Sequence, residues 1–267
     1  MAETLLRVEG LGFSWPGQNP LFHQLNLQLR RGEVLAVLGP NGRGKSTLMQ
    51  LLLGTLPLQQ GAVERGDGIG FVPQQFAAPF AYRVLDIVLM GRARYVGLFR
   101  TPSAEDHRLA KEALHSLDML GFADREFGSL SGGQRQLVLI ARALSMSCEV
   151  LMLDEPTSAL DLHHQDRVLS LISHLARERQ MAVMFSTHQP NHAHAVADRA
   201  LLLGAAGQHQ LGSCAEVLTA ESLSPLFDLA IERVALQIDG RQFETLVPLY
   251  RSQRERESES YLVVRRR

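Results

Sequence analysis

Residues 39–47 read GPNGRGKST and constrain the fold more than any other part of the chain. A glycine, four free positions and then Gly-Lys-Ser form the motif of a phosphate-binding loop. The apolar run 33–38 before it is typical of a buried strand, and leucines after it recur at helical spacing. Because this motif binds phosphate between a strand and a helix, the sequence predicts an α/β fold with a nucleoside triphosphate site.

The residue types in this loop suit a triphosphate. Its glycines let backbone N–H groups turn toward an anion, and the helix that begins near Lys45 adds the partial positive charge of its N-terminus. Lys45 is expected to reach the β- and γ-phosphates, and the Ser46 hydroxyl is expected to ligate Mg²⁺. The residues predicted to hold the phosphates are Gly39, Pro40, Asn41, Gly42, Arg43, Gly44, Lys45, Ser46 and Thr47.

Two other interpretations of the loop are weaker. A glycine-rich turn before an ordinary helix would not explain the lysine, since the chain has only two lysines, Lys45 and Lys111, and otherwise uses arginine. A compact, flexible ammonium group suits a phosphate site. A dinucleotide-binding fingerprint is excluded, because Thr47 stands where a glycine or alanine would complete that pattern.

Composition describes an ordinary globular protein of 267 residues, 45% hydrophobic and 21% charged. The formal net charge of −1 gives no reason to expect nucleic acid as a partner. Cys148 and Cys214 lack metal-ligand spacing and are expected to be unbridged thiols. The N-terminus lacks a signal-peptide pattern, and no apolar run reaches the roughly 18 residues that span a bilayer. We expect a cytoplasmic protein that meets a membrane only through a partner.

Short apolar runs alternate with helical patterns, which predicts a mostly parallel sheet. Residues 82–121 show only a helical pattern, with a helix start at Ser103 and Asp106, and are interpreted as an inserted helical subdomain. Beyond Phe227 the pattern weakens, and residues 251–267 resemble a solvated tail. The predicted strands are 5–8, 25–29, 33–38, 69–72, 150–153, 182–185 and 200–203.

Acidic side chains follow one apolar strand, at the point where ligands collect in open α/β sheets. Asp154 is expected to hold Mg²⁺, directly or through water, and Glu155 to act as the general base on the attacking water. Two acids that simply begin a loop are the ordinary alternative, which a nearby phosphate-binding loop disfavours. Gln74 also follows a strand and is expected to reach Mg²⁺ or the attacking water. His188 follows another and is expected to reach the γ-phosphate.

The segment LSGGQ at 130–134 is the most specific signal after the phosphate-binding loop. Ser131, Gly132 and Gly133 offer a hydroxyl and unhindered backbone N–H groups at the start of a helix. The chain therefore contains two anion cradles but only one phosphate-binding loop.

These motifs resemble those of ATP-binding subunits of ATP-binding-cassette (ABC) transporters. The phosphate-binding loop, Gln74, LSGGQ, VLMLDEP, SALD and His188 occur in the family's order and spacing over roughly residues 3–230. The resemblance implies a P-loop NTPase fold with a RecA-like, mostly parallel sheet and an N-terminal antiparallel β subdomain. It also implies a helical insert at about 78–146 and a partly flexible C-terminal extension at 231–267.

The resemblance also implies ATP and Mg²⁺ as cofactors, with Lys45, Gln74, Glu155 and His188 as the catalytic residues. Gln74 would sense both Mg²⁺ and a membrane subunit. Two subunits would pair head to tail, so that each LSGGQ completes the partner's ATP site. The implied nucleotide contacts outside the phosphate-binding loop are Trp15, which would stack on adenine, and Ser131, Gly132, Gly133, Gln134 and Asp161.

Three positions depart from the family pattern. Gln189 replaces the aspartate that often follows the histidine, Leu137 stands where arginine is frequent, and Arg43 occupies a position that is more often small. None of them removes a catalytic group, so ATP hydrolysis is still expected.

Residues 80–106 are similar to importers of metal chelates. The apolar run 76–80 (FAAPF) fits a groove that receives the coupling helix of a permease, although a buried lid within the helical subdomain fits it equally well. Segments 78–82 and 187–191 most resemble molybdate or tungstate importer ATPases. Iron-siderophore, haem and cobalamin importers are the alternatives.

The implied assembly is a homodimer of ATPase subunits with two copies of a transmembrane permease, at the cytoplasmic face of the bacterial inner membrane. A periplasmic or lipid-anchored binding protein would serve it indirectly. Other classes with these motifs fit less well. A DNA-repair ATPase needs a long coiled-coil insertion and usually basic surfaces, a translation-type protein normally carries two cassettes in one chain, and an exporter usually has a fused membrane domain.

Overall fold

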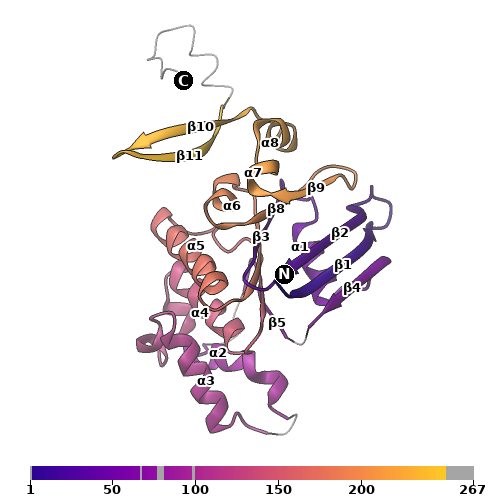
Figure 1. The fold of residues 1–267 in the computed structure, drawn as a ribbon. Coiled ribbons are helices and arrows are strands. Elements are labelled where there is room, and N and C mark those ends of the chain that lie inside the picture. Colours follow the sequence, from indigo (N-terminus) through magenta and orange to yellow (C-terminus); the bar gives the residue numbers. More distant parts are fainter. Residues whose placement is uncertain (1, 67, 77–80, 98–99, 251–267) are drawn as a thin grey trace.

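The computed structural model describes residues 2–66, 68–76, 81–97 and 100–250. Its described part contains a central six-stranded sheet with helices, a three-stranded N-terminal sheet and a C-terminal hairpin (Figure 1). The predicted tail at 251–267 and most of the FAAPF run lie outside the described residues.

The central sheet has the strand order β5-β6-β7-β3-β8-β9, and every neighbouring pair is parallel except β8 and β9. This confirms the predicted mostly parallel sheet. Its inner strands are uninterrupted apolar runs because helices and a second sheet bury both faces. The strands are β3 (Val34–Leu38), β5 (Ile69–Val72), β6 (Val150–Leu153), β7 (Ala182–Thr187), β8 (Arg199–Leu203) and β9 (His209–Ser213).

Strand β3 shows how two cores meet at the sheet. Ala36 and Leu38 belong to a core shared with the helices α4 (Gly132–Leu144), α5 (Leu162–Arg177) and α6 (Pro190–Val196). Leu35 and Val37 face the opposite core, which contains helix α1 (Lys45–Leu53) and the N-terminal sheet. Alternate side chains of a strand point to opposite faces, so one strand anchors both layers (Figure 1).

The N-terminal sheet is antiparallel, with the order β2-β1-β4, as the resemblance implied. The strands are β1 (Thr4–Phe13), β2 (Phe22–Arg30) and β4 (Gln60–Arg65). Strand β4 was not predicted, because its sequence QGAVER has no apolar alternation and its side chains are largely exposed. Backbone pairing with β1 creates it.

The helical part is more broken than its sequence pattern indicated. It contains α2 (Val84–Leu89), α3 (Ala104–His115) and α4, joined by the 3₁₀ turns η1 (Met90–Tyr95), η2 (Leu120–Phe122) and η3 (Phe127–Ser129). The predicted helix start is confirmed, since Ser103 caps α3 in a reciprocal arrangement with Asp106. Hydrogen bonds from the Ser103 side chain and backbone, and one from Arg92, lower the pKa of Asp106 to about 2.

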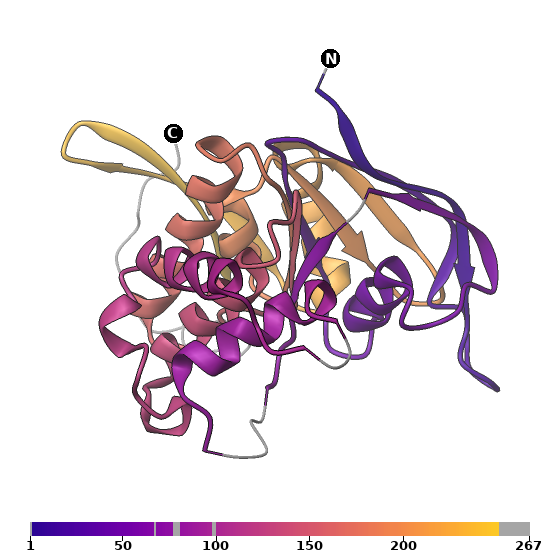
Figure 2. The same ribbon diagram turned by 90° about the horizontal axis from the view of Figure 1, so that it is seen from below.

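The C-terminal region differs most from expectation. After α7 (Cys214–Val217) and α8 (Ala220–Phe227), the chain forms a hairpin of β10 (Ile231–Ile238) and β11 (Arg241–Pro248). Sequence analysis predicted no element there. The hairpin extends away from the rest of the molecule (Figure 2). Within the described residues, no helix has the length and apolar character needed to cross a membrane.

Gly91 lies in close contact with the end of α4. A Cβ at this position would collide with the backbone oxygen of Arg142 and the Oγ of Ser145, both at the end of α4. We predict that Gly91→Ala destabilises the protein by about 1–3 kcal/mol and lowers Tm by roughly 3–10 °C, as measured by calorimetry. Gly121→Ala is the matched control, because no heavy atom lies within 4 Å of its Cβ position. Equal Tm values for the two variants would contradict this packing.

Candidate functional site

The phosphate-binding loop lies between the end of β3 and the start of α1, as predicted. Gly42 and Gly44 have positive φ angles of 79° and 92°, a conformation that favours glycine. A Cβ on Gly39 would lie 2.7 Å from the backbone oxygen of Leu203, so a larger residue would not fit there. No side chain caps the N-terminus of α1, which leaves its first N–H groups available to an anion.

Lys45 points back into the loop rather than into solvent. Its ammonium donates to the carbonyls of Gly39 (2.8 Å) and Pro40 (3.2 Å) and lies 3.1 Å from Oε1 of Glu155. Both side chains of this ion pair are at least 93% buried. The loop and the end of β6 are therefore held together by opposite charges.

Glu155 is the point on which the predicted catalytic side chains converge. Its Oε2 accepts hydrogen bonds from Nε2 of Gln74 (3.3 Å) and Nδ1 of His188 (3.2 Å), while Oε1 faces Lys45. Gln74 follows β5, Glu155 follows β6 and His188 follows β7. Lys45 begins α1, the helix after β3. The backbone of Glu155 has a φ of 45°, which is uncommon for a residue other than glycine and is seen most often at constrained sites.

Asp154 is oriented by a residue that sequence analysis did not assign to the site. The Ser186 hydroxyl donates to Oδ1 of Asp154 (2.5 Å) and accepts from the backbone N–H of Glu155 (2.8 Å). The predicted strand 182–185 continues through Ser186 and Thr187, both buried. The sequence showed only a serine after the apolar run 182–185, and its proximity to Asp154 depends on the pairing of β6 with β7.

A cavity of about 550 Å³ runs along this group of residues. Trp15 lies at it and is 38% exposed, with its ring packed edge-on against Phe13 at a centroid distance of 5.1 Å. N–H donors of the loop, the Lys45 ammonium and the Gln74 amide line this space together with the Glu155 carboxylate. The donors can receive a polyanion, with a flat apolar group at Trp15. The lining residues are Trp15, Gln18, Leu21, Asn41, Gly42, Gly44, Lys45, Ser46, Thr47, Gln74 and Glu155.

The LSGGQ segment does not line this cavity. Ser131 caps α4 and forms a reciprocal capping box with Gln134. A Cβ on Gly133 would collide with the imidazole of His164, so α4 and α5 approach closely at this glycine. Asp161 caps α5, and hydrogen bonds from the backbone and side chain of His164 lower its pKa. The LSGGQ segment and Asp161 therefore lie outside the cavity that contains Lys45.

A buried histidine supports the loop after Glu155. The Thr157 hydroxyl and Nδ1 of His192 share a hydrogen bond of 3.1 Å. Burial, with a smaller contribution from nearby His188, lowers the pKa of His192. The neutral imidazole is thus the favoured form at neutral pH, and it holds Thr157 in place.

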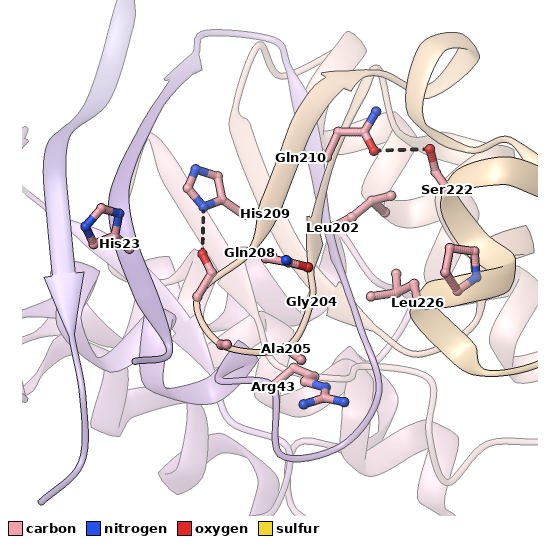
Figure 3. Close-up of a pocket in the computed structure, with 13 residues that line it drawn as sticks. His23, Arg43, Leu202, Gly204, Ala205, Gln208, His209, Gln210, Ser222 and Leu226 are labelled. Carbon is pink, nitrogen blue, oxygen red and sulfur yellow. Dashed lines mark hydrogen bonds between the residues drawn. The ribbon is translucent and has the colours of Figure 1, made fainter. Parts of the chain in front are cut away.

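A larger cavity of about 730 Å³ lies beside the loop but is a separate space (Figure 3). It is lined by His23, by the turn around residues 204–210 and by Leu226, and among residues 39–47 only Arg43 reaches it. The structure thus places Arg43 outside the cavity that contains Lys45 and Glu155, in contrast to the rest of residues 41–47.

The geometry can be compared with known proteins. A family model described as ABC transporter matches residues 22–158, which include the phosphate-binding loop, LSGGQ and the Asp154–Glu155 pair. The chain is also 50% identical to the molybdate import ATP-binding protein MolC of Haemophilus influenzae, over 92% of this chain and 97% of that protein.

The chain belongs to the ABC transporter family. A probable iron chelatin transport ATP-binding protein of Helicobacter pylori is 34% identical, over 86% of this chain and 95% of the relative. The hemin import ATP-binding protein HmuV of Rhodococcus jostii is 35% identical, over 93% of this chain and 87% of that protein.

Two solved structures of ABC proteins share the fold. A metal-chelate type ABC transporter in an inward-facing conformation matches with a TM-score of 0.90 and 49% identity, over 94% of this chain and 99% of that chain. A dimeric bacterial ABC transporter cassette matches with a TM-score of 0.67 and 26% identity, over 79% of this chain and 99% of that chain. The P-loop ABC fold predicted from the sequence is confirmed.

Ser186 provides a test of how the two acids are positioned. In Ser186→Ala, Asp154 loses a donor and the N–H of Glu155 loses its acceptor. We predict a loss of about 1–3 kcal/mol in stability and a roughly ten- to hundredfold lower kcat for ATP hydrolysis. Steady-state kinetics and denaturant unfolding measure the two effects.

Ser116→Ala is the matched control, because the Ser116 hydroxyl also donates one hydrogen bond, in this case to the carbonyl of Ala113, but lies in the helical part. It should change stability without lowering kcat. Unchanged kcat in Ser186→Ala would contradict the positioning role.

Proposed function

We propose that this chain is the ATP-hydrolysing subunit of a binding-protein-dependent ABC importer, and that its cargo is a metal oxyanion, molybdate or tungstate. The observation that carries the ATPase assignment is the convergence of Lys45, Gln74 and His188 on the buried carboxylate of Glu155. The 50% identity to a molybdate import protein supports the cargo.

In this proposal each residue has one role. The loop N–H groups and Lys45 hold the β- and γ-phosphates, and Lys45 exchanges its contact with Glu155 for the phosphates when ATP binds. Glu155 then accepts a proton from the water that attacks the γ-phosphate. Gln74 orients that water, and His188 donates to the γ-phosphate oxygens.

The donor set also fits Mg²⁺. The Ser46 hydroxyl, the Gln74 amide oxygen and the Asp154 carboxylate are the hard oxygen ligands that this ion prefers, and Ser46 and Gln74 line the cavity of about 550 Å³. Bound Mg²⁺ would neutralise charge that develops on the phosphates. Ser186 keeps Asp154 aimed by its 2.5 Å hydrogen bond.

We infer that two subunits share each ATP. LSGGQ and Asp161 lie outside the cavity that contains Lys45, yet α4 begins with small residues at a helix N-terminus, a position suited to a phosphate. A head-to-tail pair would bring Ser131, Gly132, Gly133 and Gln134 of one subunit to the γ-phosphate held by the other. ATP then acts as a bridging ligand, and its hydrolysis releases the pair.

The remaining partners follow from this function. Two copies of a membrane permease would contact the ATPase pair through the Gln74 loop and the helical part, at the cytoplasmic face of the inner membrane. A periplasmic or lipid-anchored binding protein would deliver the cargo. Iron chelates and haem are the second candidate cargoes, because relatives named for them are 34–35% identical to this chain.

Glu155→Gln tests the mechanism. It keeps the size of the side chain but removes the base, so we predict an ATPase rate that is lower by about 10²–10³ and a dimer that persists with Mg-ATP on gel filtration. Lys45→Ala is the control, because it should lose ATP binding and show no ATP-dependent gain in pairing in the same experiment. A monomeric Glu155→Gln protein at saturating ATP would contradict the shared site, and full ATP affinity in Lys45→Ala would contradict the role of Lys45.

The cargo is tested with the complete transporter in vesicles. We predict ATP-dependent uptake of molybdate or tungstate, which the cognate binding protein stimulates and Glu155→Gln abolishes. Haem and an iron chelate serve as comparison cargoes in the same vesicles. Uptake of either of these instead of the oxyanions would overturn the cargo assignment but leave the ATPase assignment intact.

A further inference from the structure

The C-terminal hairpin exposes apolar side chains in an unusual setting. Leu236, Ile238 and Phe243 are 38%, 53% and 47% exposed, and they lie on a two-stranded element that extends away from the body (Figures 1 and 2). A hairpin of two strands is marginally stable in water without packing on another surface. Clustered exposed apolar side chains mark an interaction site.

The strand register places these side chains on one face. Val234 pairs with Thr245, Leu236 with Phe243, and Ile238 with Arg241, and cross-strand partners point to the same side of an antiparallel pair. The other face carries Gln237 and Gln242, which pair with each other, and also Arg233 and Glu244. The three exposed large apolar side chains therefore lie on one side, which we call the hairpin face.

Charges are also divided between the two sides. On the polar side, Arg233 and Glu244 form an ion pair. On the hairpin face, Glu232 lies near the base and Arg241 near the tip, and no ion pair involving either of them is found among the described residues. The hairpin face thus has an apolar centre with a negative charge at one end and a positive charge at the other.

We propose that the hairpin face docks on the same face of a second copy of this chain. If two hairpins stack antiparallel about a two-fold axis through their apolar centres, Glu232 of each copy meets Arg241 of the other. Such a contact is isologous, because one surface supplies both sides. The charge order along the face makes it complementary to itself in that orientation, whereas a partner of different sequence would have to carry a matching pattern.

The base of the hairpin is tied to the catalytic region. The side chain of Asn191 accepts from the backbone N–H of Leu246 and donates to its carbonyl, both at 2.9 Å. Asn191 is in α6, three residues after His188. The hairpin is thus attached to α6, the helix that follows His188. Pairing of the hairpins would therefore hold two copies together close to the residue proposed to contact the γ-phosphate.

This contact does not depend on the shared ATP site, so it is tested on the full chain without nucleotide by sedimentation velocity over a range of concentrations. We expect reversible dimers. Phe243→Glu should weaken association by on the order of a hundredfold or more, because two copies of Phe243 lose their burial in each dimer. Gln242→Glu, the neighbouring position on the polar side, should leave association unchanged.

The orientation is tested by a charge exchange. Glu232→Arg and Arg241→Glu should each weaken association, and the double variant should regain it, because the exchanged charges again face each other across the two-fold axis. Monomers at all concentrations, equal effects of Phe243→Glu and Gln242→Glu, or no recovery in the double variant would each overturn the proposal.

The ATPase assignment is checked separately in the same proteins. Phe243→Glu should retain ATP binding by each subunit, and Lys45→Ala should retain hairpin pairing while it loses ATP. A monomeric chain whose Phe243→Glu variant no longer binds permease-containing vesicles would assign the hairpin face to the membrane subunit and overturn self-pairing.

Discussion

The ion pair between Lys45 and Glu155 is the contact on which the site depends. Two charges that are almost fully removed from water are stable only when further hydrogen bonds satisfy them. Lys45 therefore also donates to two carbonyls of its own loop, and Glu155 also accepts from Gln74 and His188. Because each of these partners stands on a different segment, the pair fixes the positions of four segments at once.

The parallel sheet makes this arrangement available. Strands β5, β6, β7 and β3 are neighbours in the sheet, and their carboxyl ends meet at one edge. The chain leaves each of these strands with a polar residue or loop: Gln74 after β5, Asp154 after β6, His188 after β7 and the phosphate-binding loop after β3. The register is held by apolar runs buried on both faces, so the core of the protein determines the geometry of its polar edge.

Two parts of the molecule carry groups suited to binding but have no binding partner among the described residues of a single copy. LSGGQ begins α4 with small residues and a capped N-terminus, away from the cavity that contains Lys45. The hairpin face has an apolar centre between opposite charges. The first is a glycine-rich helix N-terminus that does not line the cavity of Lys45, and the second is a sheet face without a covering layer among the described residues. Both are consistent with a protein that acts as a pair.

The sequence by itself determined the phosphate-binding loop, the parallel sheet and the acids at the end of β6, because glycine spacing, apolar runs and strand-end carboxylates are local patterns. Only the tertiary structure decided what depends on residues far apart in the chain. Ser186 could be recognised only where β7 lies beside β6, and Arg43 was separated from its neighbours only by the direction of its side chain. Strand β4 was missed because its sequence has no apolar alternation and backbone pairing with β1 creates it. The hairpin of β10 and β11 was missed although Val234, Leu236 and Ile238 alternate, because this short pattern faces solvent rather than the core.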